Sequence, residues 1–191
     1  MTGVQTCALP ICFPVTIGAL FTERPYGKWS RSGIGYIRGH LDAAYDGDHY
    51  NALTVMARRN DGLVQGVGTV IEGNVKNVMH NITTFFKQYN CHRIYNENNP
   101  DKGFTADLLR EKGFNVTSYP EAMNKDVKIS TFLVDMWDEI IWSDETDAEY
   151  MSQILDYREK QLPNDAPDSA SSLVRFCFNK RGFGNRNRWE W

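Results

Sequence analysis

The sequence predicts a mixed α/β fold, built on a five-stranded sheet with helices on its faces. Three observations support this fold class. Three apolar runs with turn signals between them indicate an antiparallel meander. A helix-period segment follows them directly. After that, strand-like and helix-like segments alternate, which is typical of parallel crossover connections.

The meander occupies the stretch from residue 34 to residue 71. Residues 34–43 and 52–58 are strand-like runs, joined by the turn-rich stretch AYDGDHYN. Residues 63–71 form a third run after the Asn60-Asp61-Gly62 turn signal. Three strands that follow one another at this spacing predict antiparallel neighbours.

Two helix-then-strand units follow the meander. NVKNVMHNITTFFKQY (74–89) places its apolar residues at helical spacing and should cover one face of the sheet. HRIYNEN is a short strand ending at Glu97, GFTADLLREKG is a helix closed by Gly113, and FNVTSY is a fifth strand. We expect strands four and five to be parallel.

The remainder is predicted to be mainly helical. KDVKISTFLVDMWDEI reads as a helix, IIWS as a short extended piece, and residues 147–162 as a helix with Asp147 as its N-cap. A last helix opens at Asp165 or Asp168, with Pro167 in its first turn. The predicted limits are a linker or edge segment at 12–33, one domain at 34–178 and a basic, aromatic tail at 179–191.

Composition bounds the function without fixing it. The 191 residues suffice for one domain with a core, and the formal net charge of −3 gives no general basic excess for gripping nucleic acid. The four cysteines form no C-x-x-C pair, so neither a zinc site nor a disulfide framework is indicated. A reducing, intracellular setting fits best, and no apolar run approaches the roughly 18 residues of a membrane span.

The first eleven residues, MTGVQTCALPI, look like the translation of a short-read sequencing adapter. On this interpretation they are left out of the fold, as a fusion scar would be, and the natural protein is expected to continue upstream of Phe13. A short native leader is the alternative.

Three acidic residues stand where they could converge. Asp42 ends the first strand, Glu97 ends the fourth, and Asp168 lies at the start of the late helix. Clustered carboxylates repel one another unless a cation neutralises them, and oxygen ligands without His or Cys select Mg²⁺ or Mn²⁺. Each acid also has an ordinary interpretation, as a turn residue for Asp42 and Glu97 and as a helix-start carboxylate for Asp168.

The motifs around these acids resemble the nuclease domain of tailed-phage terminase large subunits, a ribonuclease H-like fold. LDAAYDGDHYNALTVMAR resembles the opening motif of that domain, IYNENNPDKGFTADLLREKGF its Glu-Asn-Asn segment, and PNDAPDSASSLV its closing Asp-x-x-Asp helix. Carried over by position, the resemblance implies that Asp42, Glu97 and Asp168 are catalytic metal ligands and that Asp165 is an auxiliary one.

The resemblance further implies a two-metal endonuclease. This enzyme would cut concatemeric double-stranded viral DNA, in which several genomes are joined end to end, during packaging in the cytoplasm of the infected host. The portal and the small terminase subunit are then expected partners of the full-length protein. The chain has no G-x-x-x-x-G-K-[ST] phosphate loop, so the ATPase motor of a terminase is absent from it. Two alternatives stay open: another ribonuclease H-like endonuclease such as a junction resolvase, and a metal-free module that docks DNA or the portal.

Six basic residues are candidate DNA contacts. Lys125 and Lys128 follow the fifth strand near the expected active end of the sheet, where solvated helix-start residues are the alternative. The tail cations could neutralise phosphates, unless the tail is a disordered end. They are Lys180, Arg181, Arg186 and Arg188.

Overall fold

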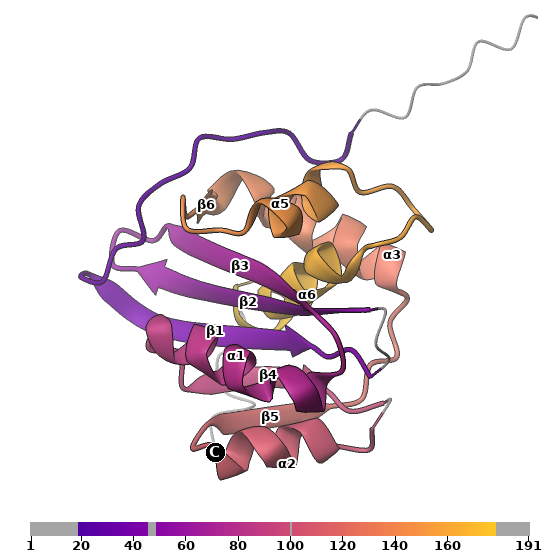
Figure 1. Cartoon of the computed structure of the whole chain (residues 1–191). Coiled ribbons are helices and arrows are strands. Elements are labelled where there is room, and N and C mark those ends of the chain that lie inside the picture. Colours follow the sequence, from indigo (N-terminus) through magenta and orange to yellow (C-terminus); the bar gives the residue numbers. More distant parts are fainter. Residues whose placement is uncertain (1–18, 46–48, 100, 179–191) are drawn as a thin grey trace, which may run out of the picture.

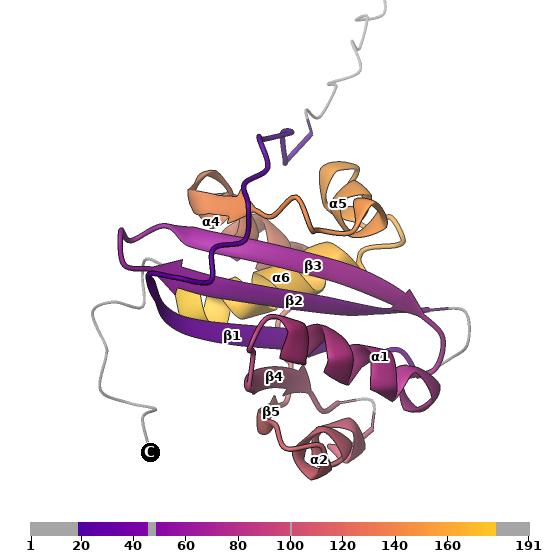
Figure 2. The ribbon, with the colours of Figure 1, turned by 60° about the vertical axis from the view of Figure 1, so that its left-hand side comes forward.

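The computed structural model describes residues 19–45, 49–99 and 101–178, and within them a six-stranded sheet lies between two helical layers (Figure 1). The strand order is β5-β4-β1-β2-β3-β6. Helix α1 lies on one face of the sheet and helix α6 on the other (Figure 2). Each face has its own hydrophobic cluster, so the sheet is buried on both sides.

The predicted meander is confirmed. Strands β1 (Ile34–Asp42), β2 (Tyr50–Arg59) and β3 (Val64–Glu72) pair antiparallel in sequence order. Asn51 holds the connection after β1 in place, because its side chain accepts a hydrogen bond from Ala44 N and donates to the carbonyls of Ile71 and Gly73.

The two parallel crossovers are confirmed as well. Helix α1 (Val75–Gln88) leads into β4 (Arg93–Glu97), which pairs parallel with β1. Helix α2 (Phe104–Glu111) leads into β5 (Asn115–Tyr119), which pairs parallel with β4. The apolar stripe of α1 packs on the sheet through Met79, Ile82 and Phe86, as its periodicity predicts.

The second face is covered by the C-terminal half of the described chain. The helical segment expected at 125–140 consists of α3 (Lys125–Lys128), a π-helical stretch (Ile129–Leu133), α4 (Val134–Met136) and a 3-10 turn (Trp137–Glu139). Helices α5 (Ala148–Leu155) and α6 (Asp165–Leu173) follow, and α6 continues into a second π-helical stretch (Val174–Phe178). Asp147 caps α5 as predicted, by accepting from Glu149 N.

Two details differ from the sequence prediction. The extended piece IIWS contains a sixth strand, β6 (Ile140–Trp142), which pairs parallel with β3. Three residues are too few to show a strand period, so this pairing is decided by packing. Helix α5 ends at Leu155 rather than near residue 162, and the chain then turns toward a cis Leu162-Pro163 peptide bond.

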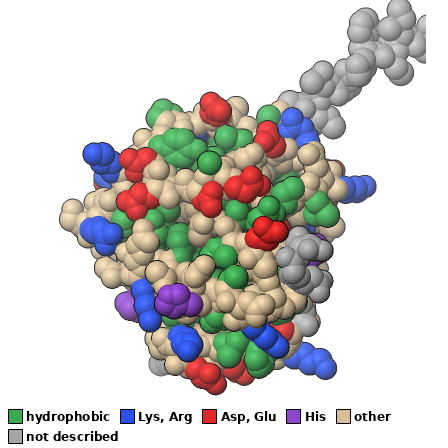
Figure 3. Space-filling model, in the orientation of Figure 1, with side chains coloured by type: hydrophobic (Ala, Val, Ile, Leu, Met, Phe, Trp, Pro, Cys, Tyr) green, Lys and Arg blue, Asp and Glu red, His purple; other side chains and the backbone are tan. Residues whose placement is uncertain are grey.

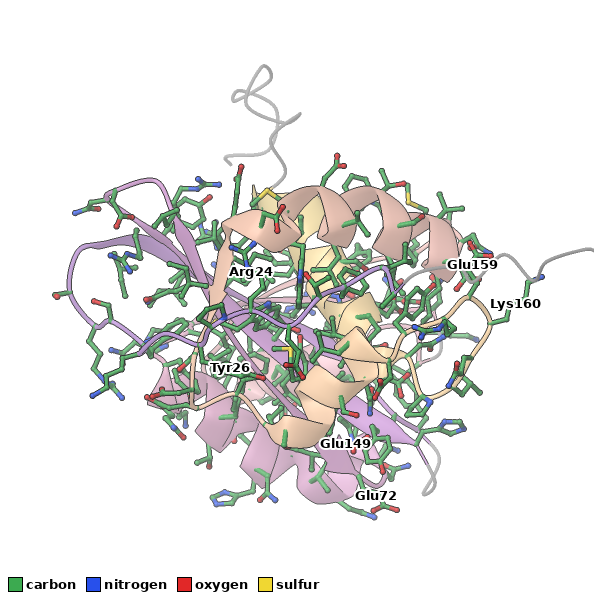
Figure 4. The ribbon with its side chains drawn as sticks, turned by 90° about the horizontal axis from the view of Figure 1, so that it is seen from above. Arg24, Tyr26, Glu72, Glu149, Glu159 and Lys160 are labelled. Atoms are coloured by element: carbon green, nitrogen blue, oxygen red, sulfur yellow. The ribbon has the colours of Figure 1, made fainter. Side chains whose placement is uncertain are left out.

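The described part of the N-terminal segment, residues 19–33, packs along the β6 edge of the sheet. Phe21 is buried and meets Trp137 edge-on at a ring-centroid distance of 4.9 Å. Gly27 forms a parallel bridge with Ser143, donating to Trp142 O at 2.8 Å and accepting from Asp144 N at 2.8 Å. Seen from above, Arg24 and Tyr26 lie on this segment (Figure 4).

The surface over α5 and β6 is acidic. Figure 3 shows acidic side chains scattered over the upper part of this face, where Figure 1 places these two elements. The exposed acids here include Asp144, Glu145 and Glu149. No helix in the described ranges is long and apolar enough to cross a membrane.

Candidate metal centre

Strand register brings Asp42 and Glu97 to the same end of the sheet. Leu41 on β1 lies opposite Asn96 on the parallel strand β4, so the next residues on the two strands are Asp42 and Glu97. Side chains alternate between faces along a strand. Asp42 therefore shares the face of His40, which contacts α6, and Glu97 shares the face of Tyr95.

Helix α6 supplies two more carboxylates to this end. Asp165 is the first residue of the helix and Asp168 lies about one turn further on, so both project from the same side. The prediction that the helix opens at Asp165 or Asp168 is thereby resolved in favour of Asp165. The side chain of Asp168 is only 6% exposed.

A buried chain of hydrogen bonds fixes α6 against the sheet. Ser169, the neighbour of Asp168, lies 3.0 Å from His40 Nδ1 and accepts from Thr54 Oγ1 at 2.8 Å. Thr54 in turn lies 2.6 Å from the hydroxyl of Tyr150, and His40 Nε2 lies 2.7 Å from the hydroxyl of Tyr119. Burial lowers the pKa of His40 well below its ordinary value, so the ring is neutral here.

The ammonium group of Lys125 stands among the carboxylates. Its Nζ lies 3.2 Å from Asp168 Oδ2, 3.6 Å from Asp165 Oδ1 and 3.9 Å from Asp42 Oδ2. It also donates to Asn164 Oδ1 at 3.0 Å. Burial acts to lower the pKa of Lys125, but the surrounding carboxylates outweigh it and raise that pKa.

A second lysine holds the other oxygen of Asp168. Lys128 Nζ lies 2.6 Å from Asp168 Oδ1 and 3.3 Å from Glu121 Oε2, and its side chain is 2% exposed. Arg175 closes this network with two hydrogen bonds to Glu121, at 2.8 and 2.9 Å. Apart from the ion pair with Lys128, no described hydrogen-bond partner reaches the buried Oδ1 of Asp168.

A pocket of about 220 Å³ lies at this end of the sheet. The described residues that line it are Asp42, Ala43, Tyr45, Glu97, Lys125 and Asp168. Burial, and secondly the charge of Asp168, raise the pKa of Asp42 to about 8. Burial likewise raises the pKa values of Glu97 and Asp165. Burial thus disfavours the ionised form of these carboxyl groups, and a bound cation would offset that cost.

The donor set fits a hard divalent cation. Its oxygens come from carboxylates and one amide, and the described residues that line the pocket include neither His nor Cys, which suits Mg²⁺ or Mn²⁺. Within the described part of the chain, no three His, Cys, Asp or Glu side chains already stand close enough to hold one ion. The ammonium of Lys125 lies among these oxygens instead.

The predicted acidic residues thus meet at one place, with one difference among them. Asp42, Asp165 and Asp168 surround Lys125, whereas Glu97 lines the same pocket without an ion pair to any described residue. Lys128 does not suit the expected phosphate contact, because it is buried and paired with Asp168 and Glu121. The tail candidates Lys180, Arg181, Arg186 and Arg188 lie outside the described residues, as does the adapter-like segment 1–11.

Sequence reasoning missed the residues that support these acids. His40 has the ordinary appearance of a scattered histidine, although its place two residues before Asp42 puts both on one face of β1. Glu121 and Asn164 lie in connecting segments, and no spacing rule links either of them to Lys128 or Lys125.

Comparison with solved structures found likeness to a large terminase nuclease from the thermophilic phage G20c. The form with bound cobalt is 11% identical with a TM-score of 0.57, over 82% of this chain and 93% of that one. The form with bound zinc is 12% identical with a TM-score of 0.56, over 80% and 91%. The form with bound magnesium is 12% identical with a TM-score of 0.54, over 81% and 92%.

No protein-family model and no curated protein sequence matches the chain. The likeness is therefore one of fold. The chain has the mixed α/β, ribonuclease H-like architecture of large terminase nuclease domains, as its sequence predicted, with six strands in place of five.

Proposed function

We propose that this chain is a metal-dependent endonuclease, the nuclease domain of a phage terminase large subunit, which cuts concatemeric double-stranded viral DNA during genome packaging. The observation that carries the proposal is the convergence of carboxylates from β1, β4 and α6 on one pocket, where three of them surround the ammonium of Lys125. The fold shared with a terminase nuclease supports it.

In this proposal Asp42, Glu97 and Asp168 hold two divalent ions, Mg²⁺ or Mn²⁺, and Asp165 is an auxiliary ligand. When bound, such ions supply charge neutralisation, an activated water and stabilisation of the leaving oxygen in phosphodiester hydrolysis. Lys128 fixes one oxygen of Asp168, and the bonds of Ser169 with His40 and Thr54 fix the helix that carries it. The residues of this chain therefore place the ligands, and no covalent intermediate with the protein is needed.

Double-stranded DNA is the proposed substrate, and the domain limits 34–178 are those of the nuclease. The portal and the small terminase subunit are proposed partners of the full-length protein, in the cytoplasm of the infected host. The net charge of −3 and the acids over α5 disfavour a broad electrostatic grip on DNA. We therefore expect weak binding that is confined to the neighbourhood of the pocket.

The test is cleavage of linear and circular double-stranded DNA in Mg²⁺ or Mn²⁺, by the parent chain and by Asp42→Asn. The matched control is Asp107→Asn, because Asp107 is exposed on α2 and forms an ion pair with Arg110 on the surface. We expect cutting by the parent and by the control, and at least a hundredfold loss in Asp42→Asn. Undiminished cutting by Asp42→Asn would overturn the assignment, and cutting restricted to a four-way junction would favour a resolvase instead.

A further inference from the structure

Two lysines on α3 approach Asp168 from opposite sides and in different surroundings. Lys128 reaches Oδ1 at 2.6 Å, is 2% exposed, and is held from behind by Glu121. Lys125 reaches Oδ2 at 3.2 Å and is 36% exposed. The first ammonium is enclosed by the protein, and the second stands at the pocket wall with access to solvent.

The oxygens around Lys125 are those a metal ion would use. Carboxylate oxygens of Asp42, Asp165 and Asp168 lie within 3.9 Å of its Nζ, and the amide oxygen of Asn164 lies at 3.0 Å. A divalent ion binds such oxygens at about 2.0–2.2 Å for Mg²⁺. A divalent ion held by these groups would need the oxygens that Lys125 now contacts and would repel its ammonium at a few ångströms, so the two cations compete for this position.

On the premise of the proposed function, we propose that Lys125 is an exchangeable counter-ion of the metal centre. Its ammonium holds the position of one divalent cation while the carboxylates are free of metal, and leaves that position when the ion binds. Lys128 is the opposite case, a fixed positioning residue that stays on Asp168 in both states. The assignment separates two lysines that are equivalent in sequence, one helical turn apart.

The consequence is a predicted gain of metal affinity on removing a charge from the site. Metal must displace Lys125 in the parent chain, so the apparent dissociation constant is raised by that competition. A Lys125→Met variant keeps the length of the side chain and removes the competitor, so divalent ions should bind about tenfold more tightly or better. The same variant without metal should be less stable, since Lys128 alone then offsets the repulsion among the carboxylates.

Calorimetric titration with Mn²⁺ and with Mg²⁺, on chelator-stripped protein, tests this proposal without any measure of cleavage. The variants are Lys125→Met, Lys125→Gln as a second removal, Lys128→Met, and Lys112→Met as the control for a lost surface charge. Lys112 is exposed at the end of α2. Thermal melting of each variant, with and without metal, reports whether it is folded.

Tighter binding in both Lys125 variants, with Lys112→Met equal to the parent and Lys128→Met weaker than the parent, is the expected result. Equal or weaker binding by the folded Lys125 variants, with binding by the parent intact, would overturn the counter-ion role and leave the proposed nuclease standing. Specific uptake absent from the parent and from every variant would instead overturn the metal centre itself. Binding that appears only when Lys125 is removed would support the inference in its strongest form.

Discussion

The imidazole of His40 lies 3.0 Å from the hydroxyl of Ser169, the residue next to Asp168. This contact joins the strand that carries one candidate metal ligand to the helix that carries two others. Because the ring is buried and its other nitrogen lies 2.7 Å from the hydroxyl of Tyr119, the joint is made with a neutral histidine. The geometry of the pocket thus depends on a side chain that an acid solution can charge.

Acidification should loosen this joint. Burial, and secondly Lys128, hold the pKa of His40 in the folded protein below its ordinary value of 6.5, so the unfolded chain binds more protons there. The contribution of His40 to the free energy of unfolding is therefore present above pH 6.5 and is lost as the pH falls below it, by at most about 1.4 kcal/mol per pH unit. Urea unfolding at pH 7.5 and 5.5 should show a flatter pH dependence for His40→Asn than for the parent. His80→Asn, at an exposed position on α1, is the control, and identical pH dependence in all three proteins would contradict the prediction.

The contribution of Asp42 to the free energy of unfolding should have the opposite pH dependence. Burial, then Asp168, raise its pKa to about 8 in the folded protein from an ordinary 3.8. Its contribution is full below pH 3.8 and is lost as the pH rises through about 8, so in a chelator the parent should weaken between pH 5 and 8.5. Asp42→Asn should reduce this loss, by on the order of 2 kcal/mol at pH 8.5. Chemical unfolding at the two pH values measures it, and an equal loss in both proteins would show that Asp42 ionises freely.

Gly68 on β3 should tolerate no side chain. A Cβ at this position would overlap the ring of Tyr150, the residue whose hydroxyl meets Thr54. Gly68→Ala should cost about 1–3 kcal/mol through overpacking. Gly35→Ala, on β1, is the matched control, because a Cβ there would meet Arg58 O at 3.6 Å, an ordinary contact. Thermal melting compares the two, and equal stabilities would mean that Tyr150 moves aside without cost.

Glu121 should be essential to the ion network behind Asp168. Its side chain is 8% exposed and pairs with both Lys128 and Arg175. Glu121→Gln leaves Arg175 without this carboxylate and Lys128 with Asp168 as its charged partner, which should cost about 3 kcal/mol. Adding Arg175→Met should recover part of the loss, so the two changes should not be additive. Unfolding free energies of the single and double variants decide this, with Glu111→Gln as an exposed control; additive losses would exclude coupling through Glu121.

The sheet could be predicted because its information is local. Alternating apolar residues and the Asn60-Asp61-Gly62 turn predict the meander, and the helix-then-strand order predicts the parallel strands that place Glu97 beside Asp42. Strand β6 could not be predicted, since three residues gain their pairing only from β3 and the N-terminal segment.

The acids could be predicted for the same reason, whereas their partners could not. Asp42 and Glu97 end strands, and Asp165 and Asp168 begin a helix, so topology alone gathers them. The sequence places Lys125 and Lys128 near the pocket, and from that position it predicts DNA contacts. It does not show that both lysines pair with Asp168. Which ammonium faces which oxygen depends on how α3 packs against α6, and that packing involves residues distant in sequence.

The bridge between Gly27 and Ser143 bears on how the protein should be handled in the laboratory. An unpaired edge strand can pair with other molecules and cause aggregation. Strand β6 is an edge strand of the sheet, and this bridge covers the sheet edge next to it. Shortened versions intended for expression should therefore begin upstream of Phe21. Trimming to Ile34, where the regular strands start, would remove this cover together with an aromatic anchor and reduce solubility.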